Sequence, residues 1–150
     1  MSTASRTAPD PVVVLDSSFL IAYYNSRDAH HAAAARAMVQ LLAGAWGRAR
    51  LLEYVFLEVV TVLQARRDAR TAASVGRTLL GAREIDFVPC SELFVEAWDT
   101  FRQQDDAGPL SFADAAIAVA ARRESPGYVL TFDADFRRLN GVTVRPSVTS

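Results

Sequence analysis

One acidic residue interrupts an otherwise apolar helical pattern and first suggests chemistry. Val55, Val59, Val62 and Leu63 recur at the spacing of one helix face, and Glu58 lies within that face, three residues after Val55. Burying an unpaired carboxylate is expensive, and such a group tends to take up a proton instead. The pattern therefore predicts that Glu58 faces inward, toward a positive charge that compensates it.

Three aspartates stand where other segments would bring them to the same place. Asp16 directly follows the first apolar run, Asp133 directly follows a later one, and Asp114 lies in the first turn of a predicted helix. Each aspartate alone is explained as readily by helix capping, and Ser111 with Asp114 has the spacing of a capping box. Capping does not explain Glu58. A pocket shared by all four acids is therefore the hypothesis that accounts for each of them.

A pocket with four carboxylates needs a compensating charge, and the chain has no lysine to supply one. Such a cluster is tolerated where some of the acids share protons or where a divalent cation binds. Ligands that are all oxygen favour a hard ion over zinc. The residue types therefore predict a Mg²⁺ or Mn²⁺ site built by Asp16, Glu58, Asp114 and Asp133.

The elements that must position these acids alternate between strands and helices. The predicted strands are 12–15, 48–52, 85–88, 128–132 and 142–145. The predicted helices are 17–24, 28–42, 54–65, 69–80, 92–104 and 111–123. This order implies an α/β fold with a parallel sheet covered on both faces. In open sheets of this kind, ligands bind beyond the carboxyl ends of the strands, where Asp16 and Asp133 would lie.

The composition limits the class of protein. A chain of 150 residues is the length of one domain, which we expect at 12–150, after a polar tail at 1–11. Its 16 basic and 17 acidic residues neither require nor exclude a nucleic-acid partner. No apolar run approaches the roughly 18 residues of a membrane span, and the first residues do not form a secretory signal. A cytoplasmic protein without membrane contact is the expectation.

Four stretches, taken in order, resemble the motifs of PIN domains. They are VLDSSFLIA at 14–22, YVFLEVVTVL at 54–63, LSFADAAIA at 110–118 and LTFDADF at 130–136. The resemblance covers nearly the whole chain, and the subtype it suggests is the VapC-like toxin of toxin–antitoxin pairs. It implies a three-layer α/β/α fold with a central, mostly parallel sheet. It also implies Mg²⁺- or Mn²⁺-dependent hydrolysis of RNA phosphodiester bonds.

The resemblance also assigns roles to individual residues. The catalytic and metal-binding acids are Asp16, Glu58, Asp114 and Asp133, with Asp135 replacing or assisting Asp133, and with Ser18 and Thr131 as polar supports. An acidic pocket must offset the charge of an RNA substrate, and the candidates for phosphate contact include Arg48, Arg50 and Arg137. The implied partners are RNA, a cognate antitoxin protein and a second copy of the chain as a homodimer.

An antitoxin would need an apolar surface beside the acids. The helices at 17–24 and 54–65 carry Phe19, Leu20, Tyr23 and Phe56, and we expect a subset of these to form a groove for an amphipathic peptide. An arginine of that peptide would pair with the carboxylates and block the pocket.

Two other functions stay open at this point. A catalytically silent PIN-like module that binds RNA or protein would share the fold, although such modules generally lose one or more of the acids. A phosphatase-like hydrolase would use an Asp-x-Asp pair, as in Asp133-Ala134-Asp135, but that chemistry needs a lysine, and the chain has none.

Overall fold

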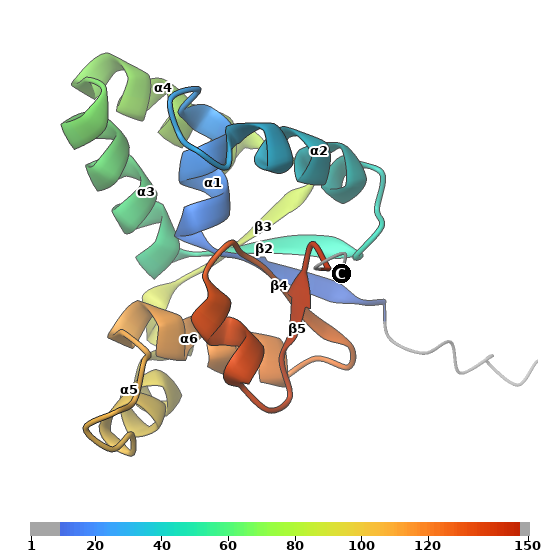
Figure 1. Cartoon of the computed structure of the whole chain (residues 1–150), viewed down its shortest axis with the longest axis vertical. Coiled ribbons are helices and arrows are strands. Elements are labelled where there is room, and N and C mark those ends of the chain that lie inside the picture. The colour runs from blue at the N-terminus through green and yellow to red at the C-terminus, as the bar shows by residue number, and fades with distance from the viewer. Residues whose placement is uncertain (1–9, 148–150) are drawn as a thin grey trace, which may run out of the picture.

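The computed structural model describes residues 10–147, and the predicted tail at 1–11 lies almost entirely outside this range. Five parallel strands form one sheet in the order β3-β2-β1-β4-β5 (Figure 1). The strands are β1 (Val12–Leu15), β2 (Arg48–Leu52), β3 (Ile85–Val88), β4 (Gly127–Leu130) and β5 (Thr143–Arg145). The predicted α/β class with a central parallel sheet is confirmed.

The central strand explains why the first apolar run is so uniform. β1 pairs with β2 on one side and with β4 on the other, and all four of its residues are buried. A parallel strand covered on both faces has no solvent-facing side, so a continuous β-branched run replaces the alternation of an exposed strand. Asp16 follows this strand at the carboxyl edge of the sheet.

Six α-helices cover the two faces of the sheet in the described part of the chain. They are α1 (Ser17–Tyr24), α2 (His31–Leu42), α3 (Glu53–Arg66), α4 (Ala69–Gly81), α5 (Phe94–Arg102) and α6 (Phe112–Arg122). Helices α1 to α4 lie on one side of the sheet, where α3 packs on both α1 and α4. Helices α5 and α6 pack together on the other side, and α6 contacts β1 and β4 (Figure 1). The layers bring α1, α3 and α6 to the same edge.

The structure corrects three predicted boundaries, each for a local reason. The helix predicted from Asp28 begins at His31, because the side chain and carbonyl of Asp28 accept the N–H groups of His30 and His31 in a preceding turn. The helix predicted at 92–104 is divided into a 3-10 turn, η1 (Cys90–Glu92), and α5, with a non-helical Leu93 between them.

The third correction concerns β4, which ends at Leu130 rather than at Phe132. The backbone N–H groups of Phe132 and Asp133 donate to the hydroxyls of Ser18 and Thr131 instead of continuing the sheet. A short 3-10 helix that the sequence did not predict, η2 (Ala134–Arg138), follows at once. Asp133 therefore stands three residues beyond the strand and not directly after it.

Within residues 10–147, no helix combines the length and the apolar character that a membrane crossing requires.

Candidate active site

Asp16 is a buried acid whose side chain is held from two directions. The hydroxyls of Ser18 and Thr131 each donate to its Oδ2 at 2.7 Å. Asp16 occupies the N-cap position of α1, yet its carboxylate makes no capping hydrogen bond to that helix. Capping therefore does not account for this residue. Burial raises the pKa of Asp16 above 3.8, and the two hydroxyl donors oppose the rise.

The same two hydroxyls also hold the segment that carries Asp133. Ser18 Oγ accepts the N–H of Phe132 at 3.0 Å, and Thr131 Oγ1 accepts the N–H of Asp133 at 2.9 Å. Each hydroxyl thus donates to Asp16 and accepts from the chain after β4. This arrangement locks the position of Asp133 to that of Asp16, although 117 positions separate them in the numbering.

Asp114 has a capping role and an electrostatic one. Its Oδ2 accepts the N–H of Ser111, and the Ser111 hydroxyl accepts the N–H of Asp114, so the capping box foreseen from the sequence is present. Burial raises the pKa of Asp114 from 3.8 to about 6, and the charges of Asp16 and Asp133 add to the rise. A cap alone would not place this carboxylate near two others.

The last motif separates its two acids. Asp133 caps η2, and its Oδ1 accepts the N–H of Asp135 at 2.9 Å. Asp133 lines the same hollow as Asp16 and Asp114, whereas Asp135 is not among the residues that line it. The structure therefore brings Asp133, and not Asp135, to the lining of the hollow.

The burial predicted for Glu58 is wrong, because its side chain is exposed, although it lines the same hollow as Asp16, Asp114 and Asp133. The core face of α3 consists of Val55, Val59 and Leu63, and Glu58 lies beside that face with an exposed side chain. One turn of helix separates Glu58 from Val62, which is only partly buried, so this edge of α3 borders solvent. No buried charge needs to be compensated here.

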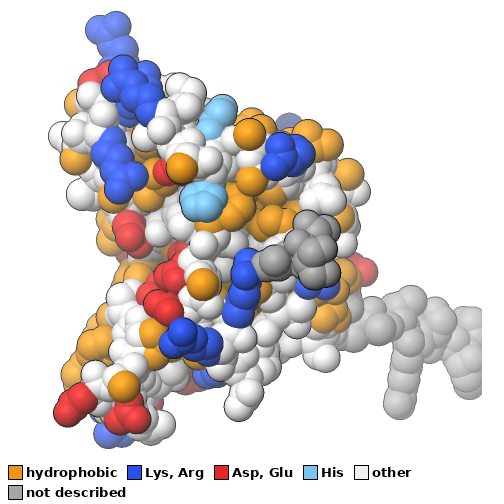
Figure 2. Space-filling model, viewed as in Figure 1, with side chains coloured by type: hydrophobic (Ala, Val, Ile, Leu, Met, Phe, Trp, Pro, Cys, Tyr) orange, Lys and Arg blue, Asp and Glu red, His pale blue; other side chains and the backbone are white. Residues whose placement is uncertain are grey.

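The four acids line one open hollow of about 460 Å³ at the carboxyl edge of the sheet. Acidic side chains gather in the waist between the two helical layers (Figure 2). Three further charged or titratable residues line the hollow, namely Asp28, His30 and Arg66. The sequence did not predict that Asp28 and His30 line this hollow, because a turn before a helix explains both residues.

Comparison with known proteins identifies the family of this chain. The sequence profile of the PIN domain matches residues 13–142. The chain belongs to the PIN-domain family. PIN domains are a family of nucleases, and four acids in one hollow at the carboxyl edge of a parallel sheet agree with that membership. No curated protein sequence is similar enough to this PIN domain to count as a match.

Solved structures similar to this PIN domain include toxins. The VapC20 toxin of Mycobacterium tuberculosis, described as cleaving the sarcin–ricin loop, is 27% identical, with a TM-score of 0.75 over 89% of this chain and 99% of its own. VapBC2 from Rickettsia felis, bound to a promoter DNA fragment, is 11% identical, with a TM-score of 0.64 over 89% and 96%. A Klebsiella pneumoniae toxin–antitoxin complex is 20% identical, with a TM-score of 0.58 over 87% and 95%. The last two comparisons show the fold alone.

The carboxylate oxygens that line the hollow of this PIN domain are the type of ligand that a hard divalent cation prefers. The hydrogen bonds described above engage Oδ2 of Asp16, Oδ2 of Asp114 and Oδ1 of Asp133, so each carboxylate has a second oxygen that these bonds do not use. Within residues 10–147, no three acidic, histidine or cysteine side chains lie close enough together to hold an ion in their present positions. Binding would therefore require the acidic side chains to rotate toward a common point.

The arginines predicted to contact RNA are divided between two ends of the sheet. Arg48 begins β2 and forms an ion pair with Asp86, and Arg50 forms an ion pair with Glu124. Both pairs lie toward the amino ends of the strands, away from the acids, so the structure does not bring these two arginines to the hollow. Arg137 lies on η2, one turn after Asp133, and lines a neighbouring cavity.

Proposed function

We propose that this protein is a metal-dependent endoribonuclease that hydrolyses RNA phosphodiester bonds and serves as the toxin of a toxin–antitoxin pair. The observation that carries the proposal is the hollow in which Asp16, Glu58, Asp114 and Asp133 converge from four separate segments. The raised pKa of Asp114 agrees with a site whose negative charge is incompletely balanced by the protein itself. Membership of a nuclease family supports the same reaction class.

The residues of this chain supply position and charge. Asp16, Asp114 and Asp133 accept hydrogen bonds from neighbouring protein groups, and together with the exposed Glu58 they would hold Mg²⁺ or Mn²⁺. A divalent cation in such a site lowers the pKa of water and stabilises negative charge on the phosphate and on the leaving oxygen. Ser18 and Thr131 keep Asp16 and Asp133 at a constant separation. Hydrolysis then needs no histidine as a general base.

The experiment that tests this function is an RNA cleavage assay with purified protein. The first substrate is an RNA hairpin that carries the sarcin–ricin loop, because the Mycobacterium tuberculosis neighbour is described as cleaving that loop. Cleavage is expected with Mg²⁺ or Mn²⁺, and loss of cleavage is expected with a chelator or with Asp16→Asn. A panel of unrelated RNA hairpins and ribosomal RNA widens the search for a substrate. Products that persist in Asp16→Asn would reveal a contaminating nuclease.

A catalytically silent PIN-like module is the rival function. It predicts RNA or protein binding without products at any Mn²⁺ concentration. A thermal shift separates the two functions further, because specific binding of Mn²⁺ to the folded protein raises Tm. Absence of both cleavage and a Mn²⁺-dependent rise in Tm would favour the silent module.

The antitoxin surface we propose differs from the groove expected from the sequence. Phe19 and Leu20 are completely buried and cannot contact a partner. Tyr23 instead lines an apolar hollow of about 280 Å³ between α1, α2 and α4, together with Met38 and Leu79. This hollow is at the end of α1 remote from Asp16. Because an eight-residue helix is about 12 Å long, a peptide that joins the two hollows needs about two helical turns.

Occlusion by an antitoxin is tested with the protein encoded by the neighbouring gene. We expect a short segment of it to occupy the apolar hollow, to pair an arginine with the carboxylates of the acidic hollow, and thereby to suppress cleavage at fixed Mg²⁺. Undiminished cleavage in a complex verified by size-exclusion chromatography would contradict occlusion and leave an isolated ribonuclease.

A homodimer is part of the proposal, and α5 offers the surface for it. Phe94, Val95 and Trp98 are 54%, 70% and 48% exposed, which is unusual for three large apolar side chains on one short helix. Sedimentation analysis of wild type and of Trp98→Ser tests this surface. We expect a dimer for the wild type and a shift toward monomer for the variant.

A further inference from the structure

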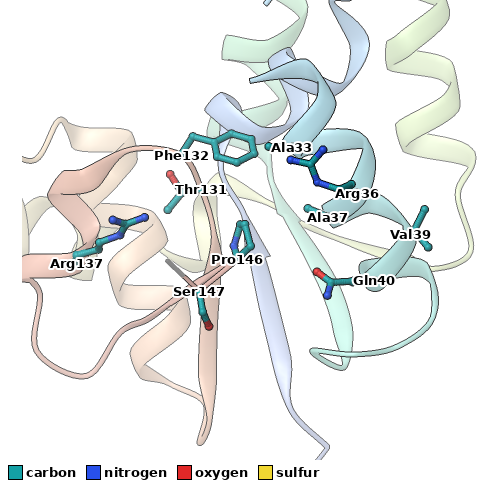
Figure 3. A pocket seen from close by; sticks show the side chains of 10 residues that line it. All are labelled: Ala33, Arg36, Ala37, Val39, Gln40, Thr131, Phe132, Arg137, Pro146 and Ser147. Carbon is teal, nitrogen blue, oxygen red and sulfur yellow. The ribbon is translucent and has the colours of Figure 1, made fainter. Parts of the chain in front are cut away.

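A second cavity adjoins the acidic hollow, and the function proposed above does not use it. It has a volume of about 640 Å³ and lies between α2 and the chain segment that follows β4 (Figure 3). Small-molecule sites in proteins range over about 300–1,000 Å³, so the space is sufficient for one nucleotide. The residues that line it include Arg36, Gln40, Phe132 and Arg137.

Two arginines face this cavity from opposite walls. Arg36 extends from α2 and Arg137 from η2, and both guanidinium groups point toward the space between them (Figure 3). Both side chains are exposed, and neither forms an ion pair with another residue in the range 10–147. Four other arginines of this protein, including Arg48 and Arg50, do have acidic partners. Within the described residues, the positive charges of Arg36 and Arg137 therefore have no acidic partner.

An aromatic pair separates the cavity from the acids. The rings of His30 and Phe132 are stacked, with centroids 4.8 Å apart and planes inclined by 8°. His30 lines the acidic hollow, whereas Phe132 lines the cavity. Thr131, which donates to Asp16, also lines the cavity, so the two spaces lie on either side of the segment 131–133. A polymer that passes from one space to the other crosses this aromatic pair.

We propose that this cavity is a nucleotide subsite, which holds one unpaired nucleotide next to the RNA phosphate at the acids. Arg36 and Arg137 contact the backbone phosphate of that nucleotide, and its base packs against Phe132. Arginine is suited to phosphate contacts, and stacking on an aromatic ring accepts any base. This inference rests on the proposed ribonuclease function, and it names the residues that offset the substrate charge in place of Arg48 and Arg50.

The physical need for the subsite follows from the charge of the hollow. The acids repel a phosphate, so affinity for RNA must come from groups outside the hollow. Among the described residues, Arg66 is the one arginine that lines the hollow itself. Two unpaired arginines immediately beside it supply the missing attraction, and the base contact fixes which nucleotide lies next to the cleaved bond.

The test measures RNA binding separately from cleavage. A fluorescently labelled single-stranded RNA is titrated with protein carrying Glu58→Gln, which is expected to prevent cleavage, in Mg²⁺ at several salt concentrations. Addition of Arg36→Ala or of Arg137→Ala is expected to weaken binding about tenfold. Each loss of one phosphate contact should also reduce the slope of log K against log salt by about 0.7, the value for single strands.

Two matched variants show that the loss is specific. Arg77→Ala removes an exposed arginine of α4, outside the cavity, and should change affinity by less than about twofold. Arg137→Lys retains the charge and should keep the wild-type salt slope, because counterion release depends on the charge, even where loss of the planar fork weakens the contact. Thermal unfolding of each variant verifies that the fold is intact.

The base contact has its own signal. 2-Aminopurine, a base whose fluorescence is quenched by stacking, is placed at successive positions of the RNA. One position next to the cleaved bond should be quenched by the protein, and Phe132→Leu should restore its fluorescence. Binding and quenching with no cleavage by the wild type would overturn the ribonuclease function but support the subsite. Normal cleavage, with Arg36→Ala and Arg137→Ala both equal to Arg77→Ala, would overturn the subsite alone.

Discussion

Replacement of Asp114 by Asn should stabilise the protein in the absence of metal, by an amount that grows between about pH 4 and pH 6 and is complete above pH 6. Burial and the charges of Asp16 and Asp133 raise the pKa of Asp114 from 3.8 to about 6. Asn has no charge, yet its side-chain oxygen can still accept the N–H of Ser111, so the capping box of α6 survives. The substitution therefore removes the charge and leaves the local structure unchanged.

The sign and the size of the effect follow from proton linkage. Between about pH 4 and pH 6 the folded protein binds more protons at Asp114 than the unfolded chain does, so the free energy of unfolding falls as pH rises through this range. The difference from 3.8 to about 6 corresponds to roughly 3 kcal/mol. The carboxyl group borders an open hollow, and screening by solvent reduces this to about 1–2 kcal/mol.

The assay is urea unfolding in a chelator at pH 4, 5, 6 and 7.5, for wild type and Asp114→Asn. The two proteins should be equally stable at pH 4. At pH 7.5 the variant should be more stable by about 1–2 kcal/mol, or by about 2–8 °C in Tm for a chain of this size. Asp106→Asn, which removes an exposed charge from the turn before α6, should show no such divergence. Curves that stay parallel for wild type and Asp114→Asn at every pH would refute the raised pKa.

Three other substitutions separate the roles of the remaining residues. Glu58→Gln should abolish RNA cleavage and change Tm by less than about 2 °C, because Glu58 is exposed; a large fall in Tm would mean a structural role. Asp133→Asn should lower the cleavage rate by several orders of magnitude and Asp135→Asn by much less, because Asp133 lines the hollow and Asp135 does not. Equal losses of the cleavage rate in kinetic assays would mean that the two acids share coordination of the metal. Thr131→Val should lower the free energy of unfolding at pH 7 by about 1–3 kcal/mol in urea titrations, because the buried Asp16 side chain loses a hydrogen-bond donor; unchanged stability would contradict this.

Local patterns in the sequence were sufficient for most of the elements and for naming four candidate acids, all of which line the hollow. The buried run at 12–15 and the capping pair Ser111 and Asp114 involve residues within four positions of one another, so their physics is visible without the fold. The order of strands and helices was likewise enough for a parallel α/β sheet, because chain connectivity restricts the possible topologies. The position of Arg48 at the start of a strand already implied that it lies at the amino edge, far from Asp16.

Tertiary structure alone decided how the acids meet and what surrounds them. The Thr131 hydroxyl donates to Asp16 across 115 positions of sequence. The same hydroxyl accepts the N–H of Asp133, and β4 ends two residues before its predicted end because this hydroxyl replaces the sheet as hydrogen-bond partner. The exposure of Glu58 could not be predicted from the sequence of α3 alone. The width of the buried face of a helix depends on the elements that pack on it, which for α3 include α1 and α6. The cavity between Arg36 and Arg137 exists for a similar reason. Its walls come from opposite ends of the chain, and only the packed layers bring them together.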